Sequence, residues 1–530
     1  MANWLDLSNN ANCFESMYVK GFVDISGGSL QLRNADNHLL VGGDASFNGG
    51  VYLGGKKLVV SDVVESLSFT GTINQLGQDI DGEAENDESG WSVSINGDGT
   101  IVAIGAYYND GTTTGNAGHV RIYQYDSGND IWNQLGQDID GDGEAADDES
   151  GRSVSINGDG TIVAIGAPYN DGTDLGYEAG HTRIYQYDSG NDIWNQLGND
   201  IDGEDFYDFS GYSVSLNSDG NIVAIGAYNN DGTGEDPMGH VRIYQYDSGN
   251  DIWNQLGQDI DGEAAGDWFG YSVSLSSDGT TVAIGAKQND GTGAGNEGHV
   301  RIYQYDSGND IWNQLGNDID GEASSDYSGW SVSINGDGSR VAIGAPYNDG
   351  TTTSNAGHVR IYQYDSSNDI WNQMGQDIDG EDAKDYSGWS VSISSDGTIV
   401  AIGAYKNNGT SDNDAGHVRI YQYDSGNDIW NQLGYDIDGE AVDDYSGSSV
   451  SLSSDGSRVA IGAYLNYGTS TDTIWNSGHV RIYELESTKT YVQVSKQIPL
   501  QIGTETQRLG YAADISGIVD ISGALFTHGD

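Results

Sequence analysis

Residues 239–263 read GHVRIYQYDSGNDIWNQLGQDIDGE, and nearly the same stretch returns from Gly118, Gly298, Gly357 and Gly416. The pattern Gly-x-Ser-Val-Ser marks the period more sharply. Its first serine occurs at Ser92, Ser153, Ser213, Ser272, Ser331, Ser390 and Ser449. Successive serines are 61, 60, 59, 59, 59 and 59 residues apart. A fixed period of this size indicates a solenoid, a propeller or another repeat array.

Each unit contains four short runs that alternate as half-buried β-strands do. In the fourth unit these runs are 271–276, 281–286, 299–305 and 311–319. Tight Gly-containing turns join the first run to the second and the third to the fourth. No segment reads as a helix, so we expect an all-β fold, a seven-bladed β-propeller of four-stranded antiparallel blades. A linear β-solenoid is the alternative, but seven units can close a ring.

The ends of the repeat predict how the ring closes. Residues 73–80 repeat the wording of a fourth strand although no first strand precedes them. Residues 491–498 occupy the fourth-strand position of the last unit, but their sequence no longer matches the repeat. We expect 73–80 to complete the last blade, with 491–498 as the alternative.

Charge and composition exclude several classes of binding partner. The 530 residues include 81 Asp and Glu against 20 Lys and Arg, a formal net charge of −61. Such acidity disfavours nucleic acid and anionic membrane surfaces as partners. Cys13 is the single cysteine, which excludes an intrachain disulfide framework. We find no secretory signal in the first 22 residues and no apolar stretch long enough to span a bilayer.

Several stretches resemble FG-GAP repeats, the blades of integrin α-subunit propellers. They are FGYSVSLSSDG from Phe269, VAIGA from Val282, GAPYNDG from Gly166 and Gly344, and GHVRIY in most units. The resemblance covers about 73–498 and implies a seven-bladed propeller. FG-GAP blades often carry an Asp-rich calcium loop between the first two strands. This chain has a short turn there, similar to the hairpins of WD-repeat propellers, so the resemblance does not extend to that calcium site.

Acidic residues gather instead where the fourth strand leads into the next unit. The first set is Asp79, Asp81, Glu83 and Asp87, and the fifth is Asp318, Asp320, Glu322 and Asp326. Alternating carboxylates beside a glycine suit a hard cation, so calcium could bind there, although the sequence requires no cofactor. Turn capping and a solvated acidic rim are the alternative. The histidine that begins each third strand, such as His299, is expected to be structural, and no catalytic constellation stands out.

Variation between units falls in two of the four connections, second-to-third and fourth-to-first, which an antiparallel meander places on one face. Aromatic residues gather in the same connections, as suits sugar rings. The expected ligand-binding residues are Trp268, Trp475, Trp91, Tyr212, Tyr271, Trp330, Trp389 and Tyr467. Packing between blades is the alternative for those that precede Ser-Val-Ser. Trp268 and Trp475 are expected to lie outside the repeat's pattern and to favour binding.

The ends of the chain differ from the repeat, so we divide it into 1–70, 71–498 and 499–530. The first segment has short β runs but little core of its own, and GGDASFNGGVYLGG from Gly42 resembles structural and fibre-like proteins of large algal viruses. We therefore expect a non-enzymatic virion attachment protein. Residues 1–70 would contact other virion or capsid proteins, or a second copy, and the propeller would bind a host surface glycan or protein. An adhesion protein of a marine microbe, at the cell surface or secreted, and a propeller glycosidase or lyase are the alternatives.

Overall fold

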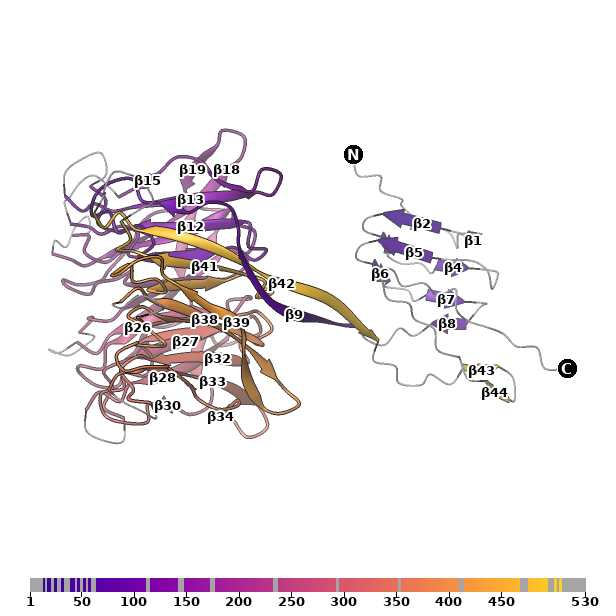
Figure 1. Cartoon of the computed structure of the whole chain (residues 1–530). Helices are drawn as coiled ribbons and strands as arrows, with labels where there is room; N and C mark the ends of the chain where they lie inside the picture. Colours follow the sequence, from indigo (N-terminus) through magenta and orange to yellow (C-terminus); the bar gives the residue numbers. More distant parts are fainter. Residues whose placement is uncertain are drawn as a thin grey trace. The chain divides into compact units, whose positions relative to one another are not determined.

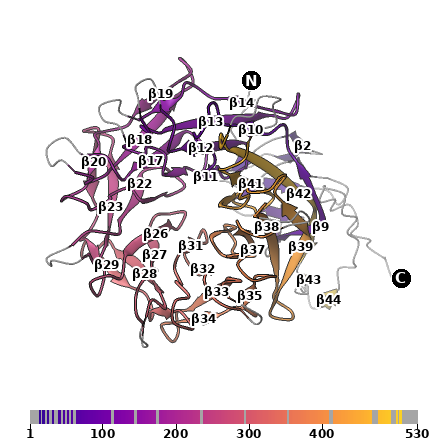
Figure 2. The ribbon, with the colours of Figure 1, turned by 60° about the vertical axis from the view of Figure 1, so that its left-hand side comes forward.

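Seven antiparallel sheets are arranged around a central axis, as the computed structural model shows (Figures 1 and 2). This confirms the predicted all-β, seven-bladed propeller. The structure describes residues 71–486 apart from 111–114, 142–146, 172–176, 232–236, 292–294, 351–353, 409–413 and 468–474. Outside that range it describes only the backbone of strands. The described residues contain no helix that could span a membrane.

We name the four main strands of each blade A to D, from the axis outward. A short fifth strand follows D in the sequence and, like D, pairs with strand C. Blade 1 contains β11 (Ser92–Ile95), β12 (Ile101–Ala106), β13 (His119–Asp126), β14 (Ile131–Gln134) and β15 (Ile139–Asp140). Blade 2 contains β16 (Ser153–Ile156), β17 (Ile162–Ala167), β18 (His181–Asp188), β19 (Ile193–Gln196) and β20 (Ile201–Asp202). Blade 3 contains β21 (Ser213–Leu216), β22 (Ile222–Ala227), β23 (His240–Asp247), β24 (Ile252–Gln255) and β25 (Ile260–Asp261).

The remaining blades follow the same order. Blade 4 contains β26 (Phe269–Leu275), β27 (Thr281–Ala286), β28 (His299–Asp306), β29 (Ile311–Gln314) and β30 (Ile319–Asp320). Blade 5 contains β31 (Ser331–Ile334), β32 (Arg340–Ala345), β33 (His358–Asp365), β34 (Ile370–Gln373) and β35 (Ile378–Asp379). Blade 6 contains β36 (Ser390–Ile393), β37 (Ile399–Ala404), β38 (His417–Asp424) and β39 (Ile429–Asp438). Blade 7 contains β40 (Ser449–Leu452), β41 (Arg458–Ala463) and β42 (His479–Gln493).

The N-terminal side of the propeller completes blade 7, as predicted. Strands β9 (Val63–Gln75) and β10 (Ile80–Asp81) both pair with β42, in the places that D and the fifth strand take elsewhere. Ile80 lies opposite Val480, and the Leu76 N–H donates to the Ile482 carbonyl at 2.8 Å. Figure 2 shows the indigo and yellow strands meeting in one sheet. The alternative closing segment, 491–498, lies outside the residues whose side chains are described.

Strand D is shorter than the sequence predicted. The expected run 311–319 is divided into β29 and β30 on either side of Gly316, whose φ is 73°. The Gly316 N–H donates to the Asp369 carboxylate of the next blade at 2.9 Å, and a Cβ there would lie against the Trp371 indole. The break in strand D therefore allows this close contact with the next blade. In blade 6 the two parts remain one strand, β39.

The Ser-Val-Ser motif joins neighbouring blades. The first serine donates its hydroxyl to a glycine carbonyl of the next blade, as Ser272 does to Gly329 at 2.9 Å. The second serine accepts a backbone N–H from the next blade, as Ser274 does from Ile334 at 3.0 Å. Each bond type recurs at all seven boundaries and forms a closed circle.

A third circle runs through the A–B turns. The Ser277 N–H donates to the Gly336 carbonyl, and the Gly336 N–H donates to the Ser395 carbonyl. Seven such bonds of 2.8–2.9 Å return to their starting point through Ser454 and Gly97. The turn residues are glycine or serine throughout, since their backbones approach closely here.

The hydrophobic core lies between neighbouring sheets. Strand β27 is buried along its whole length, and its Val282 and Ile284 pack with Ile243 of blade 3. On strand D, the buried Trp312 donates its indole N–H to the Leu256 carbonyl of blade 3 at 2.8 Å. Five further strand-D tryptophans make the equivalent bond, so each of blades 1 to 6 is joined to the preceding blade in this way.

Residues outside the propeller form a second unit, Met1–Phe69 with Ser487–Asp530. Its strands are β1 (Cys13–Phe14), β2 (Met17–Lys20), β3 (Val23–Ile25), β4 (Leu30–Leu32), β5 (Leu39–Gly42), β6 (Ala45–Phe47), β7 (Val51–Leu53), β8 (Lys56–Leu58), β43 (Leu500–Ile502) and β44 (Glu505–Gln507). Strand β1 pairs in parallel with β4, β2 with β5, and β3 with β6.

Gly285 provides a test of the blade spacing. A Cβ at this position would overlap the Gly329 carbonyl oxygen of the next blade and the Ser272 hydroxyl. We expect Gly285→Ala to lower the melting temperature by several degrees, since overpacking costs about 1–3 kcal/mol. Gly308→Ala is the matched control, because its Cβ would lie 3.2 Å from Asp306 Oδ1 and blade 5 has Ser367 there. Equal melting of the two variants would contradict the close approach.

Candidate functional site

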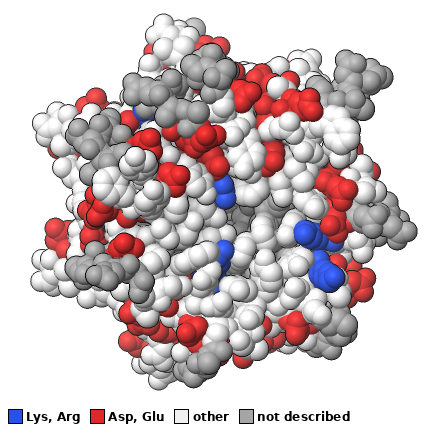
Figure 3. Space-filling model, turned by 90° about the vertical axis from the view of Figure 1, so that its left-hand side faces the viewer, with Lys and Arg blue, Asp and Glu red and all other residues white. Residues whose placement is uncertain are grey.

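The B–C and D–A connections meet at the end of the ring seen in Figure 3. An aspartate of each D–A connection braces this contact. Asp326 Oδ2 accepts hydrogen bonds from the Asn348 side chain at 2.8 Å and from the Ala323 N–H at 3.0 Å. Asp87 is bound in the same way by Asn109 and Ala84. Both aspartates are buried, so these two predicted cation ligands hold loops together instead.

The residues that precede Ser-Val-Ser form an axial ring on this face, which consists of Trp91, Arg152, Tyr212, Tyr271, Trp330, Trp389 and Ser448. All are half-buried, and most of them contact a neighbouring member across a blade boundary. The Trp330 ring lies 4.4 Å from Trp389 and 5.2 Å from Tyr271, centroid to centroid. The Arg152 guanidinium lies 4.9 Å from the Trp91 ring. Packing between blades, the alternative left open by the sequence, therefore accounts for much of this ring.

A second repeated position lies three residues earlier and has a positive φ in every blade. It is occupied by Glu88, Glu149, Phe209, Trp268, Tyr327, Tyr386 and Tyr445, with φ between 54° and 58°. This conformation is costly for bulky residues and persists where the surroundings hold it. The expectation that Trp268 lies outside the repeat's pattern was wrong. It occupies this repeated position, half-buried, with its ring 5.1 Å from Tyr228.

Blades 1 and 2 place charges where other blades have aromatic rings. Arg152 Nη1 lies 2.6 Å from Glu149 Oε2. The Tyr107 hydroxyl donates to Glu88 Oε2 at 2.7 Å. Burial raises the pKa of Glu88 to about 6, against the lowering effects of that hydrogen bond and of Arg152. Glu88 and Glu149 were not predicted as site residues, although both depart from the aromatic residues that most other blades have at this position.

Blade 4 adds a buried lysine amine to the same ring. Lys287 Nζ lies 3.4 Å from the Tyr271 ring centroid and 3.7 Å from that of Trp330. Burial lowers the pKa of Lys287 to about 6. Figure 3 shows basic side chains near the centre of this face, surrounded by acidic residues. The centre of the face therefore differs in charge from its rim.

Two groups of aromatic side chains are exposed on this face. Trp475 is 57% exposed and lies 5.5 Å from the ring of Tyr467, which is 37% exposed. Tyr177, Phe206 and Tyr207 form the other group, with ring centroids 6.3 Å from Tyr177. The sequence pointed to Trp475 and Tyr467 as binding residues. Tyr177 was not predicted, although it takes the place of Trp475 in its own blade: the Tyr207 N–H donates to the Tyr177 carbonyl as the Asn86 N–H does to that of Trp475.

Histidines and carboxylates gather at the blade boundaries. The pairing of strand C with the fifth strand places His299 opposite Asp320, and His479 opposite Asp81. Because side chains two residues apart share a face, the first aspartate of Asp-Ile-Asp lies on the same side as this histidine. Seven groups of histidine, aspartate and glutamate result, each with ligand atoms within 4.8 Å of one another.

The calcium ligands that were predicted from one loop belong to different groups in the structure. Asp79 and Asp81 gather with His479, whereas Glu83 gathers with His119 and Asp138 of blade 1. Asp318 gathers with His299 and with Glu263 of the preceding blade.

Glu322 belongs to the next boundary in the same way. Its Oε2 lies 3.9 Å from His358 Nδ1. A cleft of about 440 Å³ between blades 4 and 5 is lined by Glu322, Asp326, His358, Asp377 and Asp379. The sets read along one loop therefore do not form single sites. Glu83 and Glu322 lie beside the histidine of the next blade, whereas Asp79 and Asp81 lie beside His479 within blade 7.

Burial keeps these histidines neutral. Desolvation, assisted by the arginine two residues later, lowers the pKa of His119, His240, His299, His358, His417 and His479 to about 4. The arginine also links blades, since Arg121 Nη1 lies 3.3 Å from Glu83 and Nη2 donates to the Asp81 carbonyl. The histidine and arginine side chains are buried, which fits the structural role expected for them.

Comparison with known proteins supports the repeat assignment. Residues 80–123, 260–303 and 319–362 match the FG-GAP repeat family, so the chain carries FG-GAP repeats in its propeller. Searches among curated proteins gave no match.

Similar solved structures share little sequence with the chain. One, provisionally named a 6-phosphogluconolactonase, is from Bacteroides uniformis, with 12% identity, a TM-score of 0.46, and coverage of 66% of this chain and 86% of that one. A periplasmic gluconolactonase from Pseudomonas aeruginosa has 12% identity, a TM-score of 0.44, and coverage of 66% and 86%.

The buried histidines generate a pH prediction. Between the folded pKa of about 4 and the ordinary 6.5, the unfolded chain binds protons that the folded chain does not. Stability should therefore fall as the pH is lowered from 7 to about 5. Glu88 opposes this below about pH 6, because its folded pKa is raised, and buried carboxyl groups such as Asp208 and Asp444 act in the same direction. The decrease in stability should therefore be clearest between pH 7 and 6, where the histidines dominate. Calorimetric melting across this range provides the test, and a constant or rising melting temperature would contradict it.

Proposed function

We propose that this FG-GAP-repeat propeller is a non-enzymatic binding protein whose loop face recognises a surface ligand. The exposed pair Tyr467 and Trp475 carries the proposal. Large aromatic side chains that are half exposed and packed on each other are uncommon on a face with no partner. Repeats of this kind are typical of binding and adhesion proteins, which supports the same class.

The backbone beneath Trp475 is held in place by blade 1. The Asn86 N–H donates to the Trp475 carbonyl at 2.8 Å, and the Glu88 N–H donates to the Asn476 carbonyl at 3.1 Å. The Asn476 side chain donates to Asn86 Oδ1 at 3.3 Å. Such bracing reduces the loss of conformational freedom when a ligand binds. We call Tyr467, Trp475, Asn476, Asn86 and Glu88 the closing-side patch.

The chemistry of the closing-side patch favours a glycan. The faces of Tyr467 and Trp475 can cover the C–H groups of a sugar ring, while the two asparagine amides and Glu88 can bind hydroxyl groups. The acidic rim would repel a polyanion, so the proposed ligand is a neutral glycan or a glycan-bearing surface protein. Nucleic acid and membrane insertion are not part of the proposal.

The carboxylates at the blade boundaries recur in every blade, so they support no single catalytic centre. We accordingly place the chain with binding proteins and not with glycosidases or lyases. The biological setting that we propose is a virus particle, with the propeller at the virion surface and residues 1–70 bound to other virion proteins or to a second copy. An adhesion protein of a marine microbe, cell-surface or secreted, is the alternative setting. Residues 1–70 lie outside the residues whose side chains are described.

Replacing both exposed aromatics tests the binding face. We expect Tyr467→Ala with Trp475→Ala to weaken binding to a glycan array or to host cells by about tenfold, as truncation of central aromatic contacts commonly does. Melting should change little, because both side chains contact few core residues. Tyr435→Ala is the matched control, since Tyr435 is 84% exposed on strand D. Equal binding by both variants would place the site elsewhere.

The assembly role has a separate test. A chain that begins at residue 63 keeps β9 and β10 intact, so its propeller should fold and bind ligand as the full chain does. We expect it to fail to join the oligomer or particle formed by the full chain, as judged by size-exclusion chromatography and co-purification. Equal assembly of both chains would remove residues 1–62 from that role.

A further inference from the structure

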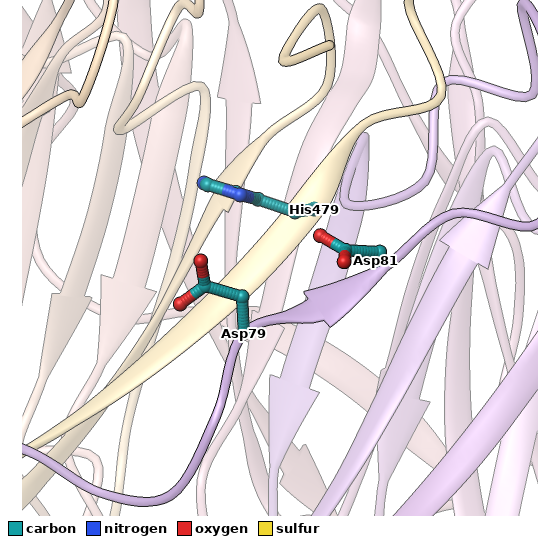
Figure 4. A group of neighbouring side chains, drawn as sticks. All are labelled: Asp79, Asp81 and His479. Carbon is teal, nitrogen blue, oxygen red and sulfur yellow. The ribbon is translucent and has the colours of Figure 1, made fainter. Parts of the chain in front are cut away.

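The sheet of blade 7, which closes the ring, contains a group assembled from opposite ends of the propeller. Asp79 and Asp81 come from the N-terminal closing segment, and His479 begins β42 in the last blade. Their three ligand atoms lie within 4.8 Å of one another, and Figure 4 shows the side chains gathered beside β42. A cation bound by these atoms would join segments that are almost 400 residues apart in the sequence.

The imidazole of His479 indicates that this group is more than an acidic cluster. His479 is only 1% exposed. Within the described part of the chain, neither Nδ1 nor Nε2 has a hydrogen-bond partner. Buried polar atoms are nearly always satisfied in native proteins, and an unsatisfied one costs about 1–3 kcal/mol. Among the seven histidines that begin strand C, all of which the structure describes, only His479 lacks a hydrogen-bond partner at both ring nitrogens.

The carboxylate of Asp79 is held in position for such a role. Gln75 Nε2 donates to Asp79 Oδ1 at 2.6 Å. The equivalent glutamine bond recurs in the other blades, as Gln314 to Asp318. Metal-binding carboxylates are commonly oriented by a neighbouring donor in this manner.

Two arginines lie near the group, and each is paired with a glutamate. Arg121 Nη2 donates to the Asp81 carbonyl at 2.9 Å, and its Nη1 lies 3.3 Å from Glu83 Oε1. Arg481 Nη1 lies 3.5 Å from Glu440 Oε1, and its Nη2 donates to the Asp438 carbonyl at 2.8 Å. Asp79 and Asp81 are both half-buried beside His479. Two carboxylates and one imidazole leave the group with a net negative charge that a divalent cation would neutralise.

The donor set selects the class of metal. One imidazole nitrogen with two carboxylates suits a borderline ion such as Zn²⁺, whereas Ca²⁺ takes six to eight oxygen ligands. Bonds of about 2.0–2.2 Å hold the ligands of one ion no more than about 4.4 Å apart. The group therefore needs only a small rotation of the aspartate side chains to close on an ion.

We propose that a divalent ion of the Zn²⁺ class binds Asp79, Asp81 and His479 and links the closing segment to blade 7. An ion at this site would join two segments that are far apart in the sequence, unlike an ion at one of the internal groups. His299 and Asp318 belong to one blade, so an ion there adds little to closure. The proposal does not depend on ligand binding at the loop face.

Thermal melting of the full chain after chelation tests the proposal. We expect Zn²⁺ to raise the melting temperature by several degrees, since an ion that binds only the folded state stabilises it. Ca²⁺ at the same concentration should raise it far less. Asp79→Asn with Asp81→Asn should lose most of the Zn²⁺ effect. The matched control is Asp318→Asn with Asp320→Asn at an internal boundary, which should keep that effect.

Co²⁺ gives a readout of coordination that is independent of stability. Visible absorption should appear when Co²⁺ is added to the parent chain, and it should decrease in the Asp79/Asp81 variant. The single variant Asp79→Asn replaces the double one if the latter does not fold without metal. The proposal is overturned if Zn²⁺ leaves the parent's melting unchanged, or if the closing and internal variants respond alike. A shift with Ca²⁺ alone would overturn the metal class.

Discussion

Closure of three hydrogen-bond circles around the axis is the constraint on which the propeller depends. Each circle needs the same donor and acceptor at all seven boundaries, through the two serines of Ser-Val-Ser and the A–B turn. Because the last bond must meet the first, every blade has to turn the chain through the same angle. This requirement fixes the small residues nearest the axis and leaves the distant connections free to vary.

The repeat itself carried most of the information needed to predict the fold. Strands A, B and C were predicted within a few residues because their alternation is strong and their turns contain glycine. The break in strand D was not predictable from the run 311–319. It depends on Asp369 and Trp371 of the next blade, which occupy the space that a continuous strand would need. The closing role of 73–80 was predictable, since this segment keeps the wording that fits beside strand C.

The candidate site was harder to predict, because its groups cross blade boundaries. The sequence predicted that Glu83 would bind a cation together with Asp79 and Asp81. In the structure, Glu83 lies beside His119 and Asp138 instead. Trp268 looked exceptional by residue type, although its backbone conformation recurs in all blades. Exposure of Trp475 was predictable from its unusual connection. The charged pair of Arg152 and Glu149 shows that departures from a repeat deserve as much weight as aromatic residues.

Completion of blade 7 by β9 also governs how the propeller would bear mechanical load. Both segments that leave the propeller, one before β10 and one after the body of β42, belong to the same sheet. Tension between a ligand held at the loop face and the chain ends would therefore enter through one blade only. The other six would receive that force across their boundaries and not along their own strands. Under such a load, the hydrogen bonds that join β9 and β10 to β42 would be the first to bear the force.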